Sequence, residues 1–114
     1  MKVIVAGSRS ICNYSFVSAS IDSSGFLISE IISGVAKGVD LLGEKYAREH
    51  NIPIKQFYPD WNKYGKSAGF IRNKQMVDYA DAVICIWDGV SKGTKHTIDL
   101  AKKYNKKLRV FRYA

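Results

Sequence analysis

The sequence predicts a small α/β protein with a Rossmann-like three-layer sandwich, in which about five parallel strands lie between two layers of helices. Short β-branched runs alternate with segments of helical periodicity, which is typical of parallel strands joined by right-handed crossovers. Three of the runs lead directly into glycine-bearing turns, at residues 7–10, 33–40 and 88–94. The 114 residues suit one domain, so we expect residues 1–114 to form a single unit.

Five runs are expected to be strands: residues 2–6, 27–32, 54–57, 82–87 and 108–111. The run at 82–87 has no alternation of apolar and polar residues, so it should be buried on both faces. We expect it to lie beside the first strand, at the point where the winding of the sheet reverses. Ligands of open α/β sheets bind at that point, outside the carboxyl ends of the strands.

Four intervening segments are expected to be helical: residues 12–24, 38–51, 69–79 and 93–104. The second has Val39, Leu42 and Tyr46 near helical spacing, and Pro53 prevents its continuation. Serines weaken the first, because their hydroxyls compete for backbone hydrogen bonds. Residues 59–68 are expected to be irregular, and a loop of this length between a strand and a helix is often functional.

An excess of basic residues gives the chain a formal charge of +8, from 18 Lys and Arg against 10 Asp and Glu. This charge favours anionic partners such as nucleotides or nucleic acid. A solvated last helix and edge strand would explain many of the basic residues equally well. With 46% hydrophobic and 25% charged residues, the composition is that of an ordinary globular protein, so disorder is not the expected state of the chain.

The two cysteines, Cys12 and Cys85, have no spacing that predicts a disulfide framework or a metal site. Cys85 lies in an apolar run and is expected in the core. The apolar start at residues 3–6 is too short for a signal peptide, and no run approaches the ~18 apolar residues of a membrane span. We expect a soluble cytoplasmic protein with no membrane partner, no metal and no cofactor.

The glycine turns predict an anion site, because glycine lets backbone N–H groups approach an oxygen closely. In the first turn, Gly7 allows a tight exit from the strand, Ser8 offers a hydroxyl and Arg9 can hold a phosphate in a bidentate fork. Arg9 stands where the dinucleotide fingerprint G-x-G-x-x-G has its second glycine, and no P-loop motif occurs. A plain turn with a solvent-facing arginine is the alternative.

In the second turn, Gly34 and Gly38 bracket Lys37 and could form an anion nest beside a point charge. Asp40 either caps the helix that follows or binds a ribose hydroxyl. Glu44 lies one helical turn later, so the two carboxylates share a face. If that face looks into the crevice, both are candidates for acid–base catalysis.

The third turn carries Ser91 and Thr94, which are either helix caps or hydroxyl donors to a ligand. In the long segment, Trp61 either stacks on a base or anchors the loop as a buried side chain. Arg72 and Asn73 begin the next helix and suit a phosphate and a nucleobase.

His50 and His96 have no partners at metal-ligand or triad spacing, so both are expected on the surface. We expect a nucleotide-like ligand to contact the three turns and the long segment together. The expected contacts are Gly7, Ser8, Arg9, Gly34, Lys37, Gly38, Asp40, Trp61, Arg72, Asn73, Asp88, Gly89, Ser91, Gly93 and Thr94.

Five motifs extend over residues 1–101: Gly-Ser-Arg, Ser-Gly-x-Ala-Lys-Gly-Val-Asp, Leu-Gly-Glu-x-Tyr-Ala, Trp-x-x-Tyr-Gly-Lys-x-Ala-Gly-x-Ile-Arg-Asn-x-x-Met and Asp-Gly-x-Ser-x-Gly-Thr-x-His-x-Ile. Together they resemble the YspA/YpsA-related branch of the SLOG superfamily. The resemblance implies a Rossmann-like domain that binds a nucleotide-derived ligand. Relatives include LOG-type phosphoribohydrolases, which cleave the base from nucleoside monophosphates, sensor domains for NAD-derived signals, and DprA-type proteins that bind single-stranded DNA.

Two positions depart from the pattern that the resemblance implies. Val35 stands where the branch usually has a second glycine, which narrows the conformations open to that loop. LOG enzymes carry Pro-Gly-Gly-x-Gly-Thr-x-x-Glu, and alignment on Gly93-Thr94 puts Thr97 at the catalytic glutamate. A glycosidase would therefore need another carboxylate, for which the candidates are Asp40, Glu44 and Asp88.

The favoured function is binding of a nucleotide-derived small molecule, ADP-ribose-like, NAD-like or a cyclic nucleotide, by a sensor or sequestering protein. The glycine turns support it directly. Nucleotide N-glycoside hydrolysis and single-stranded nucleic-acid binding are the alternatives. Because LOG-type relatives form dimers and a small sandwich often completes its pocket across an interface, a homo-oligomer is expected.

Overall fold

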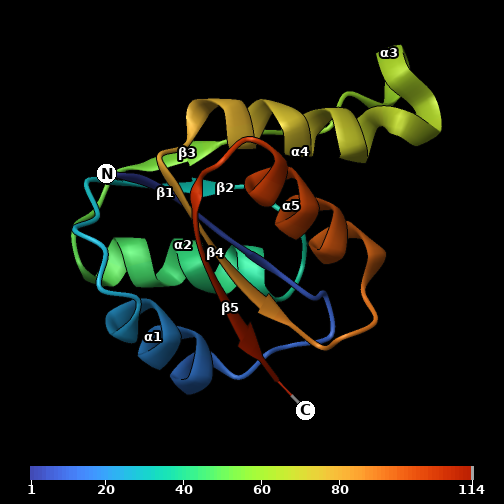
Figure 1. The fold of residues 1–114 in the computed structure, drawn as a ribbon. Helices are drawn as coiled ribbons and strands as arrows, with labels where there is room; N and C mark the ends of the chain where they lie inside the picture. The colour runs from blue at the N-terminus through green and yellow to red at the C-terminus, as the bar shows by residue number, and fades with distance from the viewer. Residues whose placement is uncertain (114) are drawn as a thin grey trace.

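The computed structural model describes residues 1–113, which form one five-stranded parallel sheet flanked by helices (Figure 1). The strands are β1 (Lys2–Gly7), β2 (Glu30–Ser33), β3 (Ile54–Gln56), β4 (Ala82–Trp87) and β5 (Lys107–Arg112). Their order across the sheet is β3-β2-β1-β4-β5. The predicted Rossmann-like fold is confirmed, and β1 lies beside β4, where the winding of the sheet reverses.

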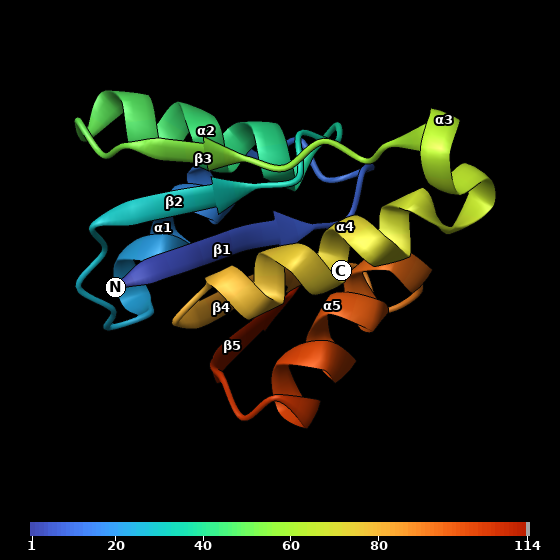
Figure 2. The ribbon, with the colours of Figure 1, turned by 90° about the horizontal axis from the view of Figure 1, so that it is seen from above.

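The helices form a layer on each face of the sheet (Figure 2). On one face lie α1 (Tyr14–Ser23) and α2 (Val39–Glu49), and on the other lie α4 (Ala68–Tyr79) and α5 (Lys92–Lys103). The short helix α3 (Trp61–Tyr64) and the 3-10 turn η1 (Gly65–Ser67) extend beyond the sheet, at the end to which the strands point. No helix within residues 1–113 is long and apolar enough to cross a membrane.

Alternation along β1 divides its side chains between the two layers. Val3 and Val5 pack in the cluster under α1 and α2, whereas Ile4 and Ala6 pack in the cluster under α4 and α5. In the central strand β4, every residue before Trp87 is buried and Trp87 is partly buried, as the continuous apolar run predicts. Cys85 is fully buried there and belongs to the core, as expected.

The carboxyl end of β1 is pressed against β4. Gly7 pairs with Ile86, and a Cβ on Gly7 would lie 2.1 Å from the carbonyl oxygen of Ile86, so only glycine fits. The next residue, Ser8, donates its N–H to the same carbonyl oxygen at 3.1 Å. The Ser8 hydroxyl oxygen accepts the N–H of Asp88 at 3.0 Å. These contacts hold the loops after β1 and β4 side by side.

Two segments differ from the sequence prediction. Residues 59–68 are not irregular, because they contain α3 and η1. The carboxylate of Asp60 accepts the N–H of Lys63 at 3.1 Å and so caps α3, which gives the segment a helical start. The second strand begins at Glu30, and Leu27, expected within it, is 86% exposed in the preceding loop.

Gly43 brings α2 close to β1, and its substitution tests this packing. A Cβ added at Gly43 would lie 2.8 Å from Cγ1 and 2.9 Å from Cβ of Val5. We expect Gly43→Ala to lower the free energy of unfolding by about 1–3 kcal/mol, because overpacking outweighs the gain in helix propensity. Urea denaturation measures the change.

Gly69 is the matched control, since it lies in α4 with only Trp61 nearby, at 3.9 Å from the added Cβ. Gly69→Ala should raise stability by about 0.5–1 kcal/mol, the usual helical preference for alanine. An equal effect of the two substitutions would contradict the close approach of α2 to β1.

Candidate functional site

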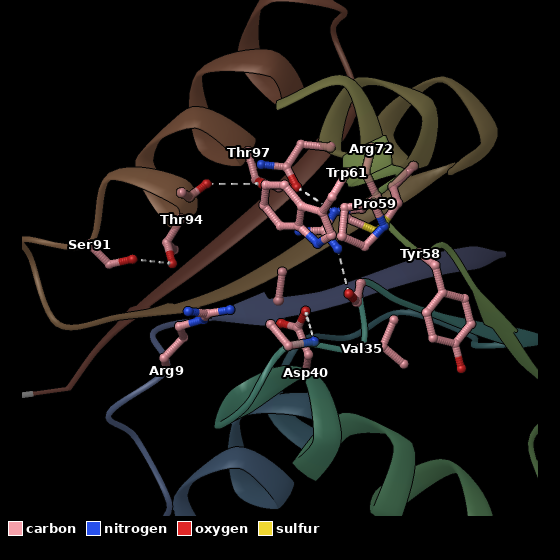
Figure 3. A pocket seen from close by; sticks show the side chains of 17 residues that line it. Arg9, Val35, Asp40, Tyr58, Pro59, Trp61, Arg72, Ser91, Thr94 and Thr97 are labelled. Atoms are coloured by element: carbon pink, nitrogen blue, oxygen red, sulfur yellow. Dashed lines mark hydrogen bonds between the residues drawn. The ribbon is translucent and has the colours of Figure 1, made fainter. Parts of the chain in front are cut away.

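A cavity of about 490 Å³ lies at the carboxyl ends of the strands, over the β1–β4 junction. Its size falls within the roughly 300–1,000 Å³ of small-molecule sites. Four stretches of chain line it: the loops after β1, β2 and β3, and the α4–α5 region with the loop after β4 (Figure 3). The three glycine turns and the long segment therefore meet around one space.

From the first loop, Gly7 and Arg9 line the cavity. The Arg9 side chain points into the space in Figure 3, and it makes no hydrogen bond to any of the residues 1–113. Its guanidinium is therefore available to a ligand. Ser8, in contrast, is 1% exposed and supports the backbone of Asp88, so it lies behind the cavity wall.

From the second loop, Gly34 and Val35 line the cavity, whereas Lys37 is exposed and does not line it. A Cβ on Gly34 would lie 2.8 Å from Oδ2 of Asp40 and 3.0 Å from Nη1 of Arg72, so glycine leaves room for both groups. Val35 has a φ of 57°, a left-handed conformation that is unfavourable for a β-branched residue. Strain of this kind is often found at binding sites.

Asp40 lies at the floor of the cavity and is 5% exposed. Its Oδ2 accepts the N–H of Ala36 at 3.3 Å. Burial raises the pKa of Asp40 to about 6, against the opposing effects of the Ala36 N–H, the Arg72 charge and the Gly7 N–H. The capping role is wrong, because Gly38, with a φ of 78°, is the N-cap of α2.

Glu44 is equally buried, but it does not line the cavity. Its carboxylate accepts the hydroxyl of Ser33 at 2.6 Å and the side-chain amide of Gln56 at 3.2 Å. The exposed Arg48 lies 3.7 Å from it. Asp40 and Glu44 share a helix face, but their carboxylates have different neighbours. Of the two, only Asp40 lines the cavity.

From the third loop and α5, Ser91, Gly93, Thr94 and Thr97 line the cavity. The hydroxyls of Ser91 and Thr94 lie 3.2 Å apart, and Thr97 donates to the carbonyl oxygen of Gly93 at 3.3 Å. Ser91 is the N-cap of α5, although its side chain does not make the capping hydrogen bond. The amino end of α5, with its partial positive charge, thus faces the cavity.

The two other residues expected from this turn lie outside the cavity lining. Asp88 accepts the N–H groups of Val90 at 2.9 Å and Ser91 at 2.8 Å, and these bonds lower its pKa. Gly89 has a φ of 90° and packs against the Arg112 guanidinium. Both residues therefore shape the turn, and the residues that follow them line the cavity.

The Arg72 side chain lines the cavity and is held in place by three hydrogen bonds. Its Nη1 donates to the carbonyl oxygens of Gly34 and Phe57, and its Nε donates to Oδ1 of Asn73 at 2.9 Å. Asn73 is itself fixed by a hydrogen bond of 3.2 Å between its Nδ2 and Nδ1 of His96. The guanidinium therefore has a set orientation before any ligand arrives.

His96 is consequently not the simple surface residue expected from the sequence. It is partly buried, its ring lies 4.4 Å from that of Phe70, and burial lowers its pKa. The lowered pKa favours the neutral ring, whose Nδ1 can accept from Asn73. His50 is exposed, as expected.

Aromatic side chains form the rim of the cavity. Trp61 is 57% exposed and Tyr58 is 66% exposed, and both lie beside Pro59 in Figure 3. The buried-anchor interpretation of Trp61 is therefore wrong. Tyr58 and Pro59 were missed in the sequence, although they follow the third strand directly, where a site residue of a parallel sheet is expected.

Comparison with known families agrees with this architecture. The family model described as "YspA, cpYpsA-related SLOG family" matches residues 1–64. The chain belongs to this family. The matched part includes β1, the glycine turns after β1 and β2, and α3. It is shorter than the residues 1–101 over which the motifs resemble the SLOG branch.

A phage protein and two solved structures are similar to this SLOG-family chain. The Gene 61 protein of Mycobacterium phage D29 is 32% identical over 79 residues, which cover 64% of this chain and 63% of that protein. DNA processing protein A of Streptococcus pneumoniae superimposes with a TM-score of 0.81 at 18% identity, over 99% of this chain and 50% of that one.

DNA processing protein A of Helicobacter pylori gives a TM-score of 0.76 at 21% identity, over 100% of this chain and 66% of that chain. At these identities, the two structures establish a shared fold. The SLOG-family chain spans less than two thirds of the length of each of these three relatives.

The burial of Asp40 gives stability a specific pH dependence. The pKa of Asp40 is about 6 in the folded protein and 3.8 as the ordinary value, so its ionisation opposes folding. The free energy of unfolding should show no loss from Asp40 below about pH 4. It should then decrease as the pH rises, by about 3 kcal/mol in total once the pH is above 6. In Asp40→Asn this component should be absent, so the variant should gain stability relative to the wild type over that range.

Urea denaturation of both proteins at several values between pH 4 and pH 7 tests this expectation. The difference between the two unfolding free energies cancels the titration of groups they share. A difference that stays constant with pH would contradict a raised pKa at Asp40.

Proposed function

We propose that the chain binds a nucleotide-derived small molecule in the cavity over the β1–β4 junction, as a sensor or sequestering protein. ADP-ribose, an NAD-like molecule or a cyclic nucleotide would each suit it. The observation that carries the proposal is convergence: the free guanidinium of Arg9, the fixed guanidinium of Arg72 and the amino end of α5 face one cavity. Positive groups gathered in this way favour a phosphate.

The remaining lining residues suit the other parts of a nucleotide. Trp61 and Tyr58 offer exposed aromatic faces on which a base can stack. Asp40 and the hydroxyls of Ser91 and Thr94 offer hydrogen-bonding groups for a ribose. The SLOG family membership supports the same ligand class.

Arg9 is the residue whose removal should affect the ligand and not the fold. Arg9→Ala should weaken binding of AMP and ADP-ribose roughly ten- to hundredfold, the effect of losing a charge-assisted hydrogen bond. The thermal midpoint without ligand should change little, because Arg9 is exposed. Isothermal titration calorimetry measures the affinities.

Arg109→Ala is the matched control, because Arg109 lies on β5, outside the cavity lining and close to Phe26. It removes the same charge and should leave affinity within about twofold of the wild type. Equal losses in the two variants would contradict a local role of Arg9. Failure of AMP, ADP-ribose, NAD and cyclic nucleotides to bind the wild type would overturn the proposal.

Single-stranded nucleic acid is an alternative ligand, favoured by the exposed aromatic rim and the charge of +8. DNA processing protein A of Helicobacter pylori, which has the same fold, binds single-stranded DNA. Nucleic-acid binding would fall steeply with salt. An oligonucleotide that binds more tightly than every nucleotide at moderate salt, and loses affinity as salt rises, would establish this alternative in place of the small molecule.

Hydrolysis of a nucleotide N-glycoside is a second candidate function, favoured by Asp40. A carboxyl group with a pKa of about 6 can act as a general acid near neutral pH. Water would add to C1′ of the ribose as the C1′–N bond breaks, Asp40 would protonate the leaving base, and the proton lost by the added water would return to Asp40. Glu44 is engaged by Ser33 and Gln56, which leaves Asp40 as the carboxylate of the cavity.

If this reaction occurs, Asp40→Asn should abolish release of free base from a nucleoside monophosphate. In the wild type, the rate should fall as the pH rises above about 6, because the acid must be protonated. Chromatography of the products of a single-turnover reaction measures the release. No release by the wild type, or release that persists in Asp40→Asn, would remove this candidate.

A further inference from the structure

A second hollow, of about 290 Å³, lies between α3 and the start of α4. Its polar lining residues are Tyr58, Asp60, Lys63, Tyr64, Arg72 and Gln75. None of the glycine turns contributes to it. Two parts of the chain build the hollow: the long segment after β3, which extends beyond the sheet (Figure 2), and helix α4.

The second hollow lies next to the main cavity, and two residues contribute to the lining of both. Tyr58 and Arg72 line both spaces. The Nη1 and Nε groups of Arg72 are engaged by Gly34, Phe57 and Asn73, whereas its Nη2 has no hydrogen-bond partner in the described chain, residues 1–113. A ligand that passes from one space to the other would lie beside this arginine.

The chemistry of the second hollow suits a sugar phosphate. Arg72 and Lys63 supply two positive charges against the single carboxylate of Asp60, and that carboxylate already accepts the N–H of Lys63 at the cap of α3. The Lys63 ammonium lies 5.2 Å from the centre of the Tyr64 ring. Gln75 and the tyrosine hydroxyls can bond to sugar hydroxyls.

We propose that the second hollow binds the distal half of a dinucleotide-type ligand, in which two ribose units are joined through phosphates. The nucleoside half occupies the main cavity, the linking phosphates lie beside Arg72 and Lys63, and the distal sugar lies against Gln75 and the tyrosine hydroxyls. This inference rests on the proposed function and narrows its ligand class from nucleotides in general to phosphate-linked pairs.

Calorimetric titration with ADP-ribose and AMP tests the inference, because AMP lacks the distal half. The wild type should bind ADP-ribose at least about tenfold more tightly than AMP, since the second hollow adds charge-assisted contacts. Lys63→Glu should weaken ADP-ribose binding about tenfold or more and leave AMP binding within about twofold. Lys63 is exposed, so the variant should fold normally, which its thermal midpoint checks.

Lys66→Glu is the matched control, because Lys66 lies three residues further on, in η1, and does not line the hollow. It makes the same charge reversal and should leave the preference for ADP-ribose in place. Equal affinities of the wild type for the two ligands, or equal effects of the two variants, would overturn the second site while nucleotide binding stands. Failure of both ligands to bind would overturn the inference together with the proposed function.

A short single-stranded oligonucleotide provides the remaining arm of the test, because it also joins riboses or deoxyriboses through phosphates. Tighter binding of a dinucleotide DNA fragment than of ADP-ribose, lost in Lys63→Glu, would overturn the small-molecule assignment of the hollow. Tighter binding of ADP-ribose would support it.

Discussion

The close contact between β1 and β4 fixes the position of the whole site. At the end of β1, Gly7 has no room for a side chain against the carbonyl oxygen of Ile86, and Ser8 bonds to the backbone of both Ile86 and Asp88. Two loops that are separated by 80 residues are thereby joined at the level of the backbone. Because all five strands are parallel, the loops after β2 and β3 end at the same edge and complete the cavity.

The charged groups of the cavity lie at separate points of its lining. The buried Asp40 sets a negative group beneath Arg72, and the free Arg9 stands opposite. Burial of Asp40 at the floor of the cavity raises the pKa of its carboxyl group. A phosphate near the two arginines and a hydroxyl near Asp40 would each meet a group of suitable charge. Under the proposed function, this pattern would favour a sugar phosphate over a simple anion.

The long segment after β3 extends the site beyond the sheet. Sequence reasoning selected this segment for its length and for Trp61, Arg72 and Asn73, and the structure places all three in the cavity lining. It did not detect α3, since a four-residue helix capped by Asp60 has too few positions for a periodic signal. Nor did it identify His96 as the support of Asn73, because the two residues lie on different helices.

By itself, the sequence determined the strand–turn–helix alternation, the neighbours β1 and β4, and the loops that carry the site, since these follow from local periodicity and from the winding of parallel sheets. Only the tertiary structure decided which side chains in those loops face inward. Ser8, Lys37 and Asp88 have suitable chemistry, yet packing turns them to the backbone or to solvent. Side-chain direction depends on contacts between distant elements, which no local pattern of residues encodes.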